Sequence, residues 1–254
     1  MKLNFIKLGA GEPLIILHGL FGMLDNWMTL GKRFSENYEV YLIDQRNHGK
    51  SPHCESHTYS DLCEDLDLFI KNNNIVNPSL IGHSMGGKVV MNYALNYNQQ
   101  LAKIIVADIA PRNYSVHYLD IVDTIFKIDI KCITSRAEAE NTITNLGVSV
   151  PITQFLLKNL ERISSNSFKW KFNLEAISAN RENLGVEILS TNKFENPALF
   201  LKGGNSNYIK NSDNELILKY FKNCQIETIP NAGHWVHADE PELFYEKVND
   251  FLGK

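Results

Sequence analysis

The chain has few cysteines, and no two of them lie close together in the sequence. Its 254 residues include four, at Cys54, Cys63, Cys132 and Cys224, with no C-x-x-C pair. A disulfide framework or a zinc finger requires closer or more numerous cysteines. We therefore expect free thiols in a reducing compartment.

Long hydrophobic runs and an excess of basic residues are also missing. The longest apolar run near the N-terminus, Leu14 to Leu17, is far too short to span a bilayer. The first residues lack the apolar core and small-residue cleavage site of a signal peptide. The formal net charge is −4, with no basic cluster that would mark a nucleic-acid footprint. We expect a cytoplasmic protein with no membrane span and no nucleic-acid partner.

Strand-like and helix-like segments alternate through most of the chain. After an edge strand at 4–8, continuous apolar runs predict buried strands at 14–17, 39–43, 80–81, 103–107, 198–201 and 225–229. Helical spacing predicts helices between them, at 25–34, 59–70, 89–95 and 211–221, and a last helix from Pro241. This alternation predicts the α/β class, with a mostly parallel sheet covered by helices on both faces.

The alternation stops in the middle of the chain. Helical patterns run over 117–126, 135–146 and 151–163, and a short alternating aromatic run follows at Phe168, Trp170 and Phe172. We expect residues 1–111 and 197–254 to form the α/β core and residues 112–196 to form a mostly helical cap inserted in it.

The stretch SLIGHSMGGKVV, at 79–90, carries the strongest functional signal. An apolar strand end is followed by Gly82-His83-Ser84-Met85-Gly86 and then by a helical run. This is the G-x-S-x-G nucleophile elbow, in which a strained turn exposes the serine hydroxyl at a helix N-terminus. The backbone amides there favour developing negative charge. We predict Ser84 as a nucleophile.

A serine hydroxyl needs a neighbouring base, and an oxyanion needs two N–H donors. In this fold the histidine comes late in the chain, so we predict His234, with His237 as the competitor. The donors are expected to be the amides of Met85 and Leu20, with Phe21 as the near alternative to Leu20. His18 is expected to brace the oxyanion loop.

The acid that orients the histidine is harder to assign. The loop after the 198–201 strand offers no carboxylate, and Ser206 stands where an aspartate is expected. A neutral hydroxyl can fix the imidazole tautomer but cannot stabilise an imidazolium as a charge does. We predict Asp108, at the end of the 103–107 strand, as the charged partner, with Ser206 sharing the histidine. Asp213 is a third option.

Two further groups of polar residues have structural interpretations. Asp44 and Arg46 are expected to form an ion pair beside the oxyanion turn. The cluster of His48, His53, Cys54 and His57 matches no common metal-binding spacing, so we expect a surface loop and no metal there. An apolar acyl pocket is expected beside the nucleophile, lined by residues such as Phe21, Phe155, Trp170 and Trp235.

These motifs together resemble the α/β-hydrolase superfamily over nearly the full length. More narrowly, seven segments resemble its small cytoplasmic carboxylesterases: HGLFG, DQRNHGKS, GHSMGGK, DIAP, QFLLKN, GGNS and AGHWVHAD. The resemblance implies an eight-stranded sheet, a helical cap, no cofactor and hydrolysis of carboxylic or thioester acyl groups. It also implies that Ser84 and His234 are the catalytic pair, and the serine at position 206 agrees with this subgroup.

The sequence therefore predicts a carboxylesterase with a serine nucleophile, acting on small to medium acyl esters through an acyl-enzyme. An acyl-CoA thioesterase is the main alternative, and its substrate's phosphates would favour a basic rim at the pocket. A non-catalytic binding protein of the same fold is a remote one, because such a protein is expected to have lost the serine or the histidine.

Overall fold

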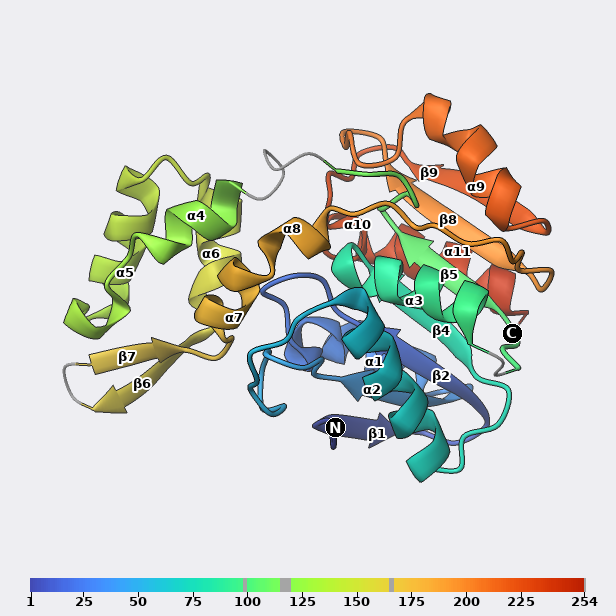
Figure 1. The fold of residues 1–254 in the computed structure, drawn as a ribbon, viewed down its shortest axis with the longest axis horizontal. Coiled ribbons are helices and arrows are strands. Elements are labelled where there is room, and N and C mark those ends of the chain that lie inside the picture. The colour runs from blue at the N-terminus through green and yellow to red at the C-terminus, as the bar shows by residue number, and fades with distance from the viewer. Residues whose placement is uncertain (98–99, 115–119, 165–166, 254) are drawn as a thin grey trace.

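A seven-stranded sheet lies at the centre of the computed structural model, which describes residues 1–97, 100–114, 120–164 and 167–253 (Figure 1). The strand order is β1-β3-β2-β4-β5-β8-β9. Strand β1 runs antiparallel to β3, and the other neighbouring strands are parallel. The strands are β1 (Phe5–Leu8), β2 (Glu12–Leu17), β3 (Tyr38–Ile43), β4 (Ser79–His83), β5 (Ile104–Ala107), β8 (Ala198–Gly203) and β9 (Cys224–Ile229). The expected α/β class is confirmed.

The sheet has one strand fewer than the resemblance implied, so the expectation of eight strands is wrong for the described residues. The residues before β1 form no further strand. The amino group of Met1 lies 2.5 Å from a carboxylate oxygen of Asp65, and Leu3 is buried in the core. The amide of Asn4 donates to the hydroxyl of Ser51 at 2.8 Å. These contacts leave β1 as the edge of the sheet.

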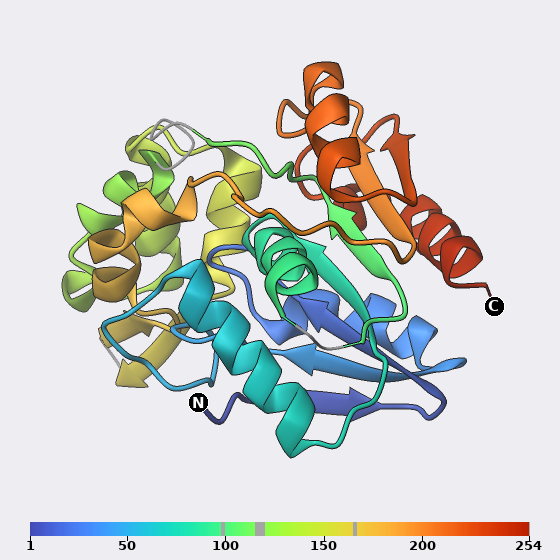
Figure 2. The ribbon, with the colours of Figure 1, turned by 45° about the vertical axis from the view of Figure 1, so that its right-hand side comes forward.

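Alternate residues along each strand face opposite helical layers, as a sheet buried on both sides requires. Leu14 and Ile16 pack in one core layer with residues of α1 (Met28–Phe34) and α11 (Pro241–Leu252). Ile15 and Leu17 pack in the other with residues of α2 (Tyr59–Asn72), α3 (Met85–Asn96) and α9 (Asn214–Tyr220). Figure 2 shows α2 and α3 in front of the sheet.

The segment between β5 and β8 lies to one side of the sheet (Figure 1). It contains the helices α4 (Asp120–Phe126), α5 (Arg136–Asn145), α6 (Val150–Leu157), α7 (Leu174–Ala179) and α8 (Arg181–Leu184). The start of the first expected helix, at 117–119, lies outside the described residues. The expected helix at 135–146 is confirmed by α5, where the Ser135 side chain accepts a hydrogen bond from the amide of Glu138.

The same segment also contains an antiparallel hairpin that the helical interpretation of 151–163 missed. Strands β6 (Leu160–Ser164) and β7 (Ser167–Trp170) pair Leu160 with Trp170 and Arg162 with Phe168. Helix α6 ends at Leu157, so the apolar pattern continues past the helix into a strand. The alternating aromatic run needs a partner strand, and the residues after α6 provide it.

Among the described residues, no helix combines the length and apolar character needed to cross a lipid bilayer.

Candidate active site

Ser84 lies on a tight turn between β4 and α3, as the elbow motif predicts. Its backbone has φ 52° and ψ −115°, a left-handed conformation that is strained for a non-glycine residue. Two close backbone approaches hold the turn. A Cβ at Gly86 would lie 2.6 Å from the carbonyl oxygens of Leu17 and His18, and one at Gly82 would lie 2.3 Å from the Gly86 oxygen. Only glycine fits at either position.

His234 faces Ser84 from the loop after β9, and Asp108 faces it from the end of β5. The Nε2 atom of His234 lies 3.0 Å from Ser84 Oγ, and its Nδ1 atom lies 2.8 Å from Asp108 Oδ2. The structure thus brings together the serine, histidine and aspartate named from the sequence. Since Asp108 is fully buried and accepts from Nδ1–H, this contact leaves Nε2 free to accept the serine proton.

Ser206 contacts the carboxylate and not the imidazole, so the expectation that it shares the histidine is wrong. Its hydroxyl donates to Asp108 Oδ2, the same oxygen that accepts from His234. The amide of Gly203 donates to Asp108 Oδ1 at 3.0 Å. Strands β5 and β8 are parallel neighbours, so Asp108 and the loop after β8 meet at one edge of the sheet. The charge therefore lies between Ser206 and the histidine.

Two other candidates named from the sequence lie away from this hydrogen-bonded line. Asp213 pairs with Arg112 at 3.2 Å and accepts from the amide of Lys210. His237 is buried and stacks on Trp27, with ring centroids 4.1 Å apart. Burial lowers the pKa of His237 to about 3, so its ring stays neutral. Neither residue holds the place of Asp108 or His234.

Tyr208 is a neighbour of His234 that sequence reasoning missed. Its ring stacks on the imidazole, with centroids 3.6 Å apart and an angle of 16°. On the other side, the Nε2–H of His83 donates to the carbonyl oxygen of His234 at 2.8 Å. Nothing in the spacing of the GGNSNY segment marks Tyr208, because the stacking depends on how two loops meet.

Met85 and Leu20 line the same cavity as Ser84. Met85 is the first residue of α3, where helical N–H groups have no partner within the helix. Phe21, the near alternative to Leu20, is already engaged, since its amide donates to His48 Nε2 at 3.1 Å. His18 braces this loop as expected, because the amide of Gln45 donates to its Nε2 atom at 3.1 Å. Leu20 is therefore the better match for an oxyanion donor.

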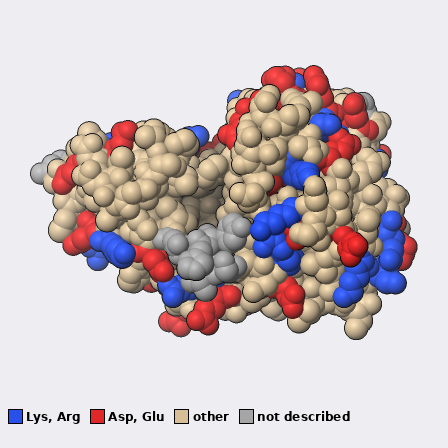
Figure 3. Space-filling view, turned by 90° about the horizontal axis from the view of Figure 1, so that it is seen from above, with Lys and Arg blue, Asp and Glu red and all other residues tan. Residues whose placement is uncertain are grey.

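A cavity of about 350 Å³ opens at Ser84, and the surface is hollowed between the two lobes of the molecule (Figure 3). Three of the expected pocket residues line it, Phe21, Phe155 and Trp235. Trp170 does not line the cavity, so that expectation is wrong. Its ring stacks on the ring of Phe172, with centroids 5.1 Å apart, and Phe172 in turn contacts Phe21. Apolar and aromatic residues not named from the sequence complete the wall: Trp27, Tyr59, Tyr114, Ile152, Leu184 and Tyr208.

Comparison with known proteins agrees with this geometry. A family model described as "alpha/beta hydrolase fold" matches residues 12–130. The sn-1-specific diacylglycerol lipase ABHD11 of Danio rerio is 38% identical over 253 residues, which cover 96% of this chain and 79% of that protein. Esterase YbfF of Escherichia coli is 31% identical over 259 residues, covering 99% of both chains. A solved structure of a marine microorganism esterase is similar with a TM-score of 0.95 and 41% identity, covering 98% of this chain and 99% of that one.

The chain belongs to the α/β-hydrolase family. The three proteins just compared are named as esterases or lipases, and this chain is an enzyme that hydrolyses ester bonds.

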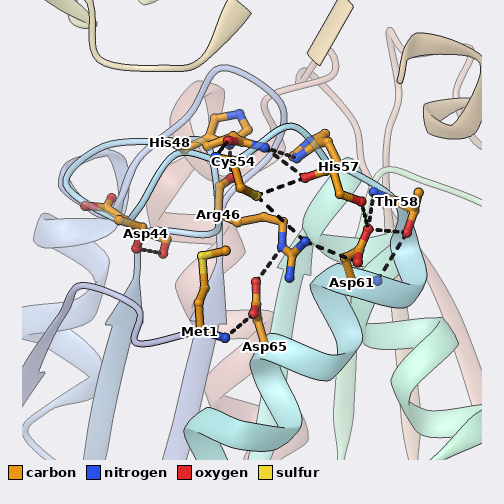
Figure 4. Close-up of polar contacts among 12 residues, drawn as sticks. Met1, Asp44, Arg46, His48, Cys54, His57, Thr58, Asp61 and Asp65 are labelled. Carbon is orange, nitrogen blue, oxygen red and sulfur yellow. Dashed lines mark hydrogen bonds and ion pairs between the residues drawn. The ribbon is translucent and has the colours of Figure 1, made fainter. Parts of the chain in front are cut away.

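Arg46 forms ion pairs with residues other than Asp44. The expectation of an Asp44–Arg46 ion pair is therefore wrong. The Arg46 guanidinium lies 2.6 Å from Asp65 and 3.3 Å from Asp61, both on α2 (Figure 4). Asp44 points the other way and accepts from the amides of Leu24 and Lys50 at 2.8 and 2.9 Å. The arginine ties the loop after β3 to α2, while the aspartate organises the loop around it.

Two histidines of the cluster in the loop after β3, His48 and His57, are buried, contrary to the expected surface position. Burial lowers the pKa of His48 and His57 to about 3 each. His53 is exposed, with its Nε2 atom 3.3 Å from the Lys171 oxygen, and the Cys54 thiol approaches the Ser56 oxygen. Within the described ranges, no three His, Cys, Asp or Glu side chains are grouped so as to hold a metal ion.

Proposed function

We propose that this α/β-hydrolase is a carboxylesterase that cleaves small to medium acyl esters through an acyl-enzyme formed on Ser84. The observation that carries the proposal is the line of hydrogen bonds from Ser84 through His234 to Asp108, at 3.0 and 2.8 Å. A serine with a base in reach, and a base held by a third group, has the geometry of nucleophilic catalysis.

In the proposed reaction, Ser84 Oγ attacks the acyl carbonyl while its proton moves to His234 Nε2. The imidazolium is stabilised by Asp108, whose charge Ser206 and Gly203 hold in place. The amides of Leu20 and Met85 bind the oxyanion, where one donor is worth about 2.7–4 kcal/mol of transition-state stabilisation. His234 then gives the proton to the leaving alcohol, and it later activates the water that hydrolyses the acyl-enzyme.

The cavity supports the proposed substrate class. Its volume of about 350 Å³ is near the lower end for small-molecule pockets, and its wall is largely aromatic and aliphatic. Among the described residues that line it there is no lysine or arginine. A lining without cations suits an uncharged acyl group.

We also propose that residues 112–196 act as the cap of this enzyme, inserted in a core of residues 1–111 and 197–254. Phe155 and Leu184, which come from this segment, line the cavity opposite core residues such as Leu20 and Trp235, and support the division. A reducing, cytoplasmic location is proposed as well, supported by four cysteines that are all free thiols.

Replacing Ser84 by alanine tests the proposed nucleophile. Ser84→Ala is expected to abolish hydrolysis of p-nitrophenyl acetate, a loss of about 10⁶-fold in turnover, because the acyl-enzyme cannot form. Thermal unfolding should change little, since only a hydroxyl is removed. The measurements are initial rates and a melting curve on the same preparation. Retained activity in a folded variant would place the nucleophile elsewhere.

A further inference from the structure

Lys88 is a fully buried lysine one helical turn after Ser84, and only 1% of its surface is exposed. Its amide donates to the Ser84 carbonyl, so it lies on the helix that begins at the nucleophile. Burying an ammonium group is unfavourable unless its hydrogen bonds are satisfied and its charge is compensated. Among the described residues no carboxylate forms an ion pair with it, so its partners have to be sought elsewhere.

Those partners are backbone carbonyl groups from two separate segments. The Nζ atom donates to the oxygen of Arg112 at 2.9 Å, to that of Gly185 at 3.5 Å and to that of Val186. An ammonium group has three N–H donors, so the three carbonyls account for all of them. The rings of Tyr114 and Tyr59 flank the charge at 5.1 and 6.0 Å.

The two segments are the connections between the sheet and helices α4–α8, and we call them the neck: residues 110–114 and 184–188. They run side by side, because the amide of Tyr114 donates to Gly185 at 2.7 Å and that of Ile188 donates to Pro111 at 2.8 Å. Figure 1 shows them as the green and orange connections leaving the sheet. Lys88 is thus a cross-link from the nucleophile helix to both sides of the neck.

The neck also borders the substrate cavity and the histidine loop. Tyr114, Leu184 and Gly185 line the cavity. The hydroxyl of Tyr114 donates to the carbonyl oxygen of Tyr208 at 2.6 Å, and Tyr208 stacks on His234. A displacement of the neck would therefore move one wall of the cavity, while the serine and the oxyanion amides stay on the core.

We propose that Lys88 is a positioning residue that fixes the neck, and with it the wall of the pocket formed by Tyr114, Leu184 and Gly185, to the nucleophile helix. The inference rests on the proposed esterase function and adds a determinant of acyl-chain recognition. An acetyl group needs only the region around Ser84, Leu20 and Met85. A longer acyl chain has to pack against the wall that the neck carries, so its binding depends on Lys88.

The test compares p-nitrophenyl acetate with p-nitrophenyl hexanoate in Lys88→Met, which keeps the volume of the side chain and removes its donors. We expect KM for hexanoate to rise about tenfold, a change of the size that one hydrogen bond to a charged group contributes. The KM for acetate should stay within about threefold of wild type, and any change in kcat that passes through Tyr114 and Tyr208 should be the same for both esters. Lys88→Arg, which restores N–H donors, should recover most of the hexanoate binding.

Lys103→Met is the matched control. Lys103 also donates to two backbone carbonyls, those of Phe251 and Leu252 at 2.9 Å each, but the helix end that it holds, unlike the neck, does not line the cavity. The Lys103→Met variant should lose thermal stability, with no change in the ratio of the hexanoate KM to the acetate KM. If Lys88→Met leaves this ratio unchanged, or if Lys103→Met shifts it equally, the proposal is overturned. The nucleophile assignment is tested separately, because Ser84→Ala should remove activity on both esters. If Ser84→Ala stays active, the proposed function fails, whereas an unchanged KM ratio in Lys88→Met overturns only the role of Lys88.

If Lys88→Met does not fold, the pH dependence of the two KM values in the wild-type enzyme tests the role of Lys88. Burial, and after it the charge of Arg112, lower the pKa of Lys88 to about 7, and the charge of Glu187 opposes this shift. Burial raises the pKa of Tyr59 and Tyr114, so these neighbours stay neutral in the same range. Loss of the proton removes one donor. The ratio of the hexanoate KM to the acetate KM should therefore rise about threefold or more between about pH 6 and pH 9. A flat ratio contradicts the proposal.

Discussion

Asp108 accepts three hydrogen bonds, one each from His234, Ser206 and Gly203. Several donors hold a carboxylate in one orientation. Its backbone has φ 49°, which is unusual for a residue other than glycine and turns the side chain toward the neighbouring β8 loop. The serine at position 206 thus supports an acid that comes from a different strand.

This arrangement predicts an order for two substitutions. Asp108→Asn should lower kcat by about 10⁴-fold, as in the serine proteases, because the amide cannot stabilise the imidazolium. Ser206→Ala should cost about tenfold or less, since it removes one donor to the carboxylate and leaves the charge. Both variants should be compared by kcat for p-nitrophenyl acetate. A larger loss in Ser206→Ala would refute the assignment of the charge to Asp108.

At the scale of elements, the site is built where three parallel strands end. Ser84 follows β4, Asp108 follows β5, and the loop with Leu20 and Phe21 follows β2. Phe21, Ser84 and Asp108 all have positive φ, between 49° and 58°. Strained residues of this kind persist only where the surrounding packing holds them. The tight contact between Gly86 and the end of β2 provides part of that support.

Gly86→Ala should therefore disturb the elbow. Its Cβ would meet backbone oxygens that cannot rotate away, and overpacking of this kind costs about 1–3 kcal/mol. Because the clash separates β2 from the start of α3, esterase activity should fall as well as the free energy of unfolding. Urea unfolding and initial rates measure the two effects.

The control for this variant is Gly147→Ala. Gly147 has φ 86° but no atom within 4 Å of its added Cβ, so the variant should lose about 1–2 kcal/mol through backbone strain and keep its activity. Equal activity losses in the two variants would contradict a specific role for the contact at the elbow.

At the scale of the whole molecule, five histidines are buried beside the site and held neutral: His18, His48, His57, His83 and His237. Burial lowers the pKa of His18 to about 4 and that of His83 well below its usual value. Several of these rings hold loops as neutral acceptors, as His48 does for the amide of Phe21. Their charging on acidification would break such contacts.

The stability of the fold should consequently fall on the acid side. A histidine with a folded pKa near 3–4 and an unfolded pKa of about 6.5 binds a proton in the unfolded chain first. The contribution of such a ring to the free energy of unfolding is complete above about pH 6.5. It is lost as the pH falls from about 6.5 to about 4, by up to about 1.4 kcal/mol per pH unit for each ring. The free energy of unfolding, measured with denaturant across this range, should fall as the pH falls. Its slope against pH should correspond to the uptake of several protons.

His57→Gln isolates one of these protons. Burial lowers the pKa of His57 to about 3, so the variant should reduce the slope by about 1.4 kcal/mol per pH unit. His53→Gln, four residues away and exposed, should leave the slope unchanged. An unaltered slope in His57→Gln would show that this ring does not carry the acid sensitivity.

The sequence by itself determined the α/β class and the place of Ser84, His234 and Asp108. Local signals suffice for this, because apolar runs define parallel strands and parallel strands bring their carboxyl ends to one edge. Glycines at Gly82 and Gly86 reveal the turn, since no other residue fits there.

Only the tertiary structure decided which side chains meet. That Ser206 binds Asp108, that Arg46 pairs with α2 and that Trp170 lies behind Phe172 depend on contacts between segments far apart in the chain. The same is true of the hairpin β6–β7 and of Lys88 in the neck. Side-chain directions at such meetings follow from packing across elements, which local periodicity does not encode.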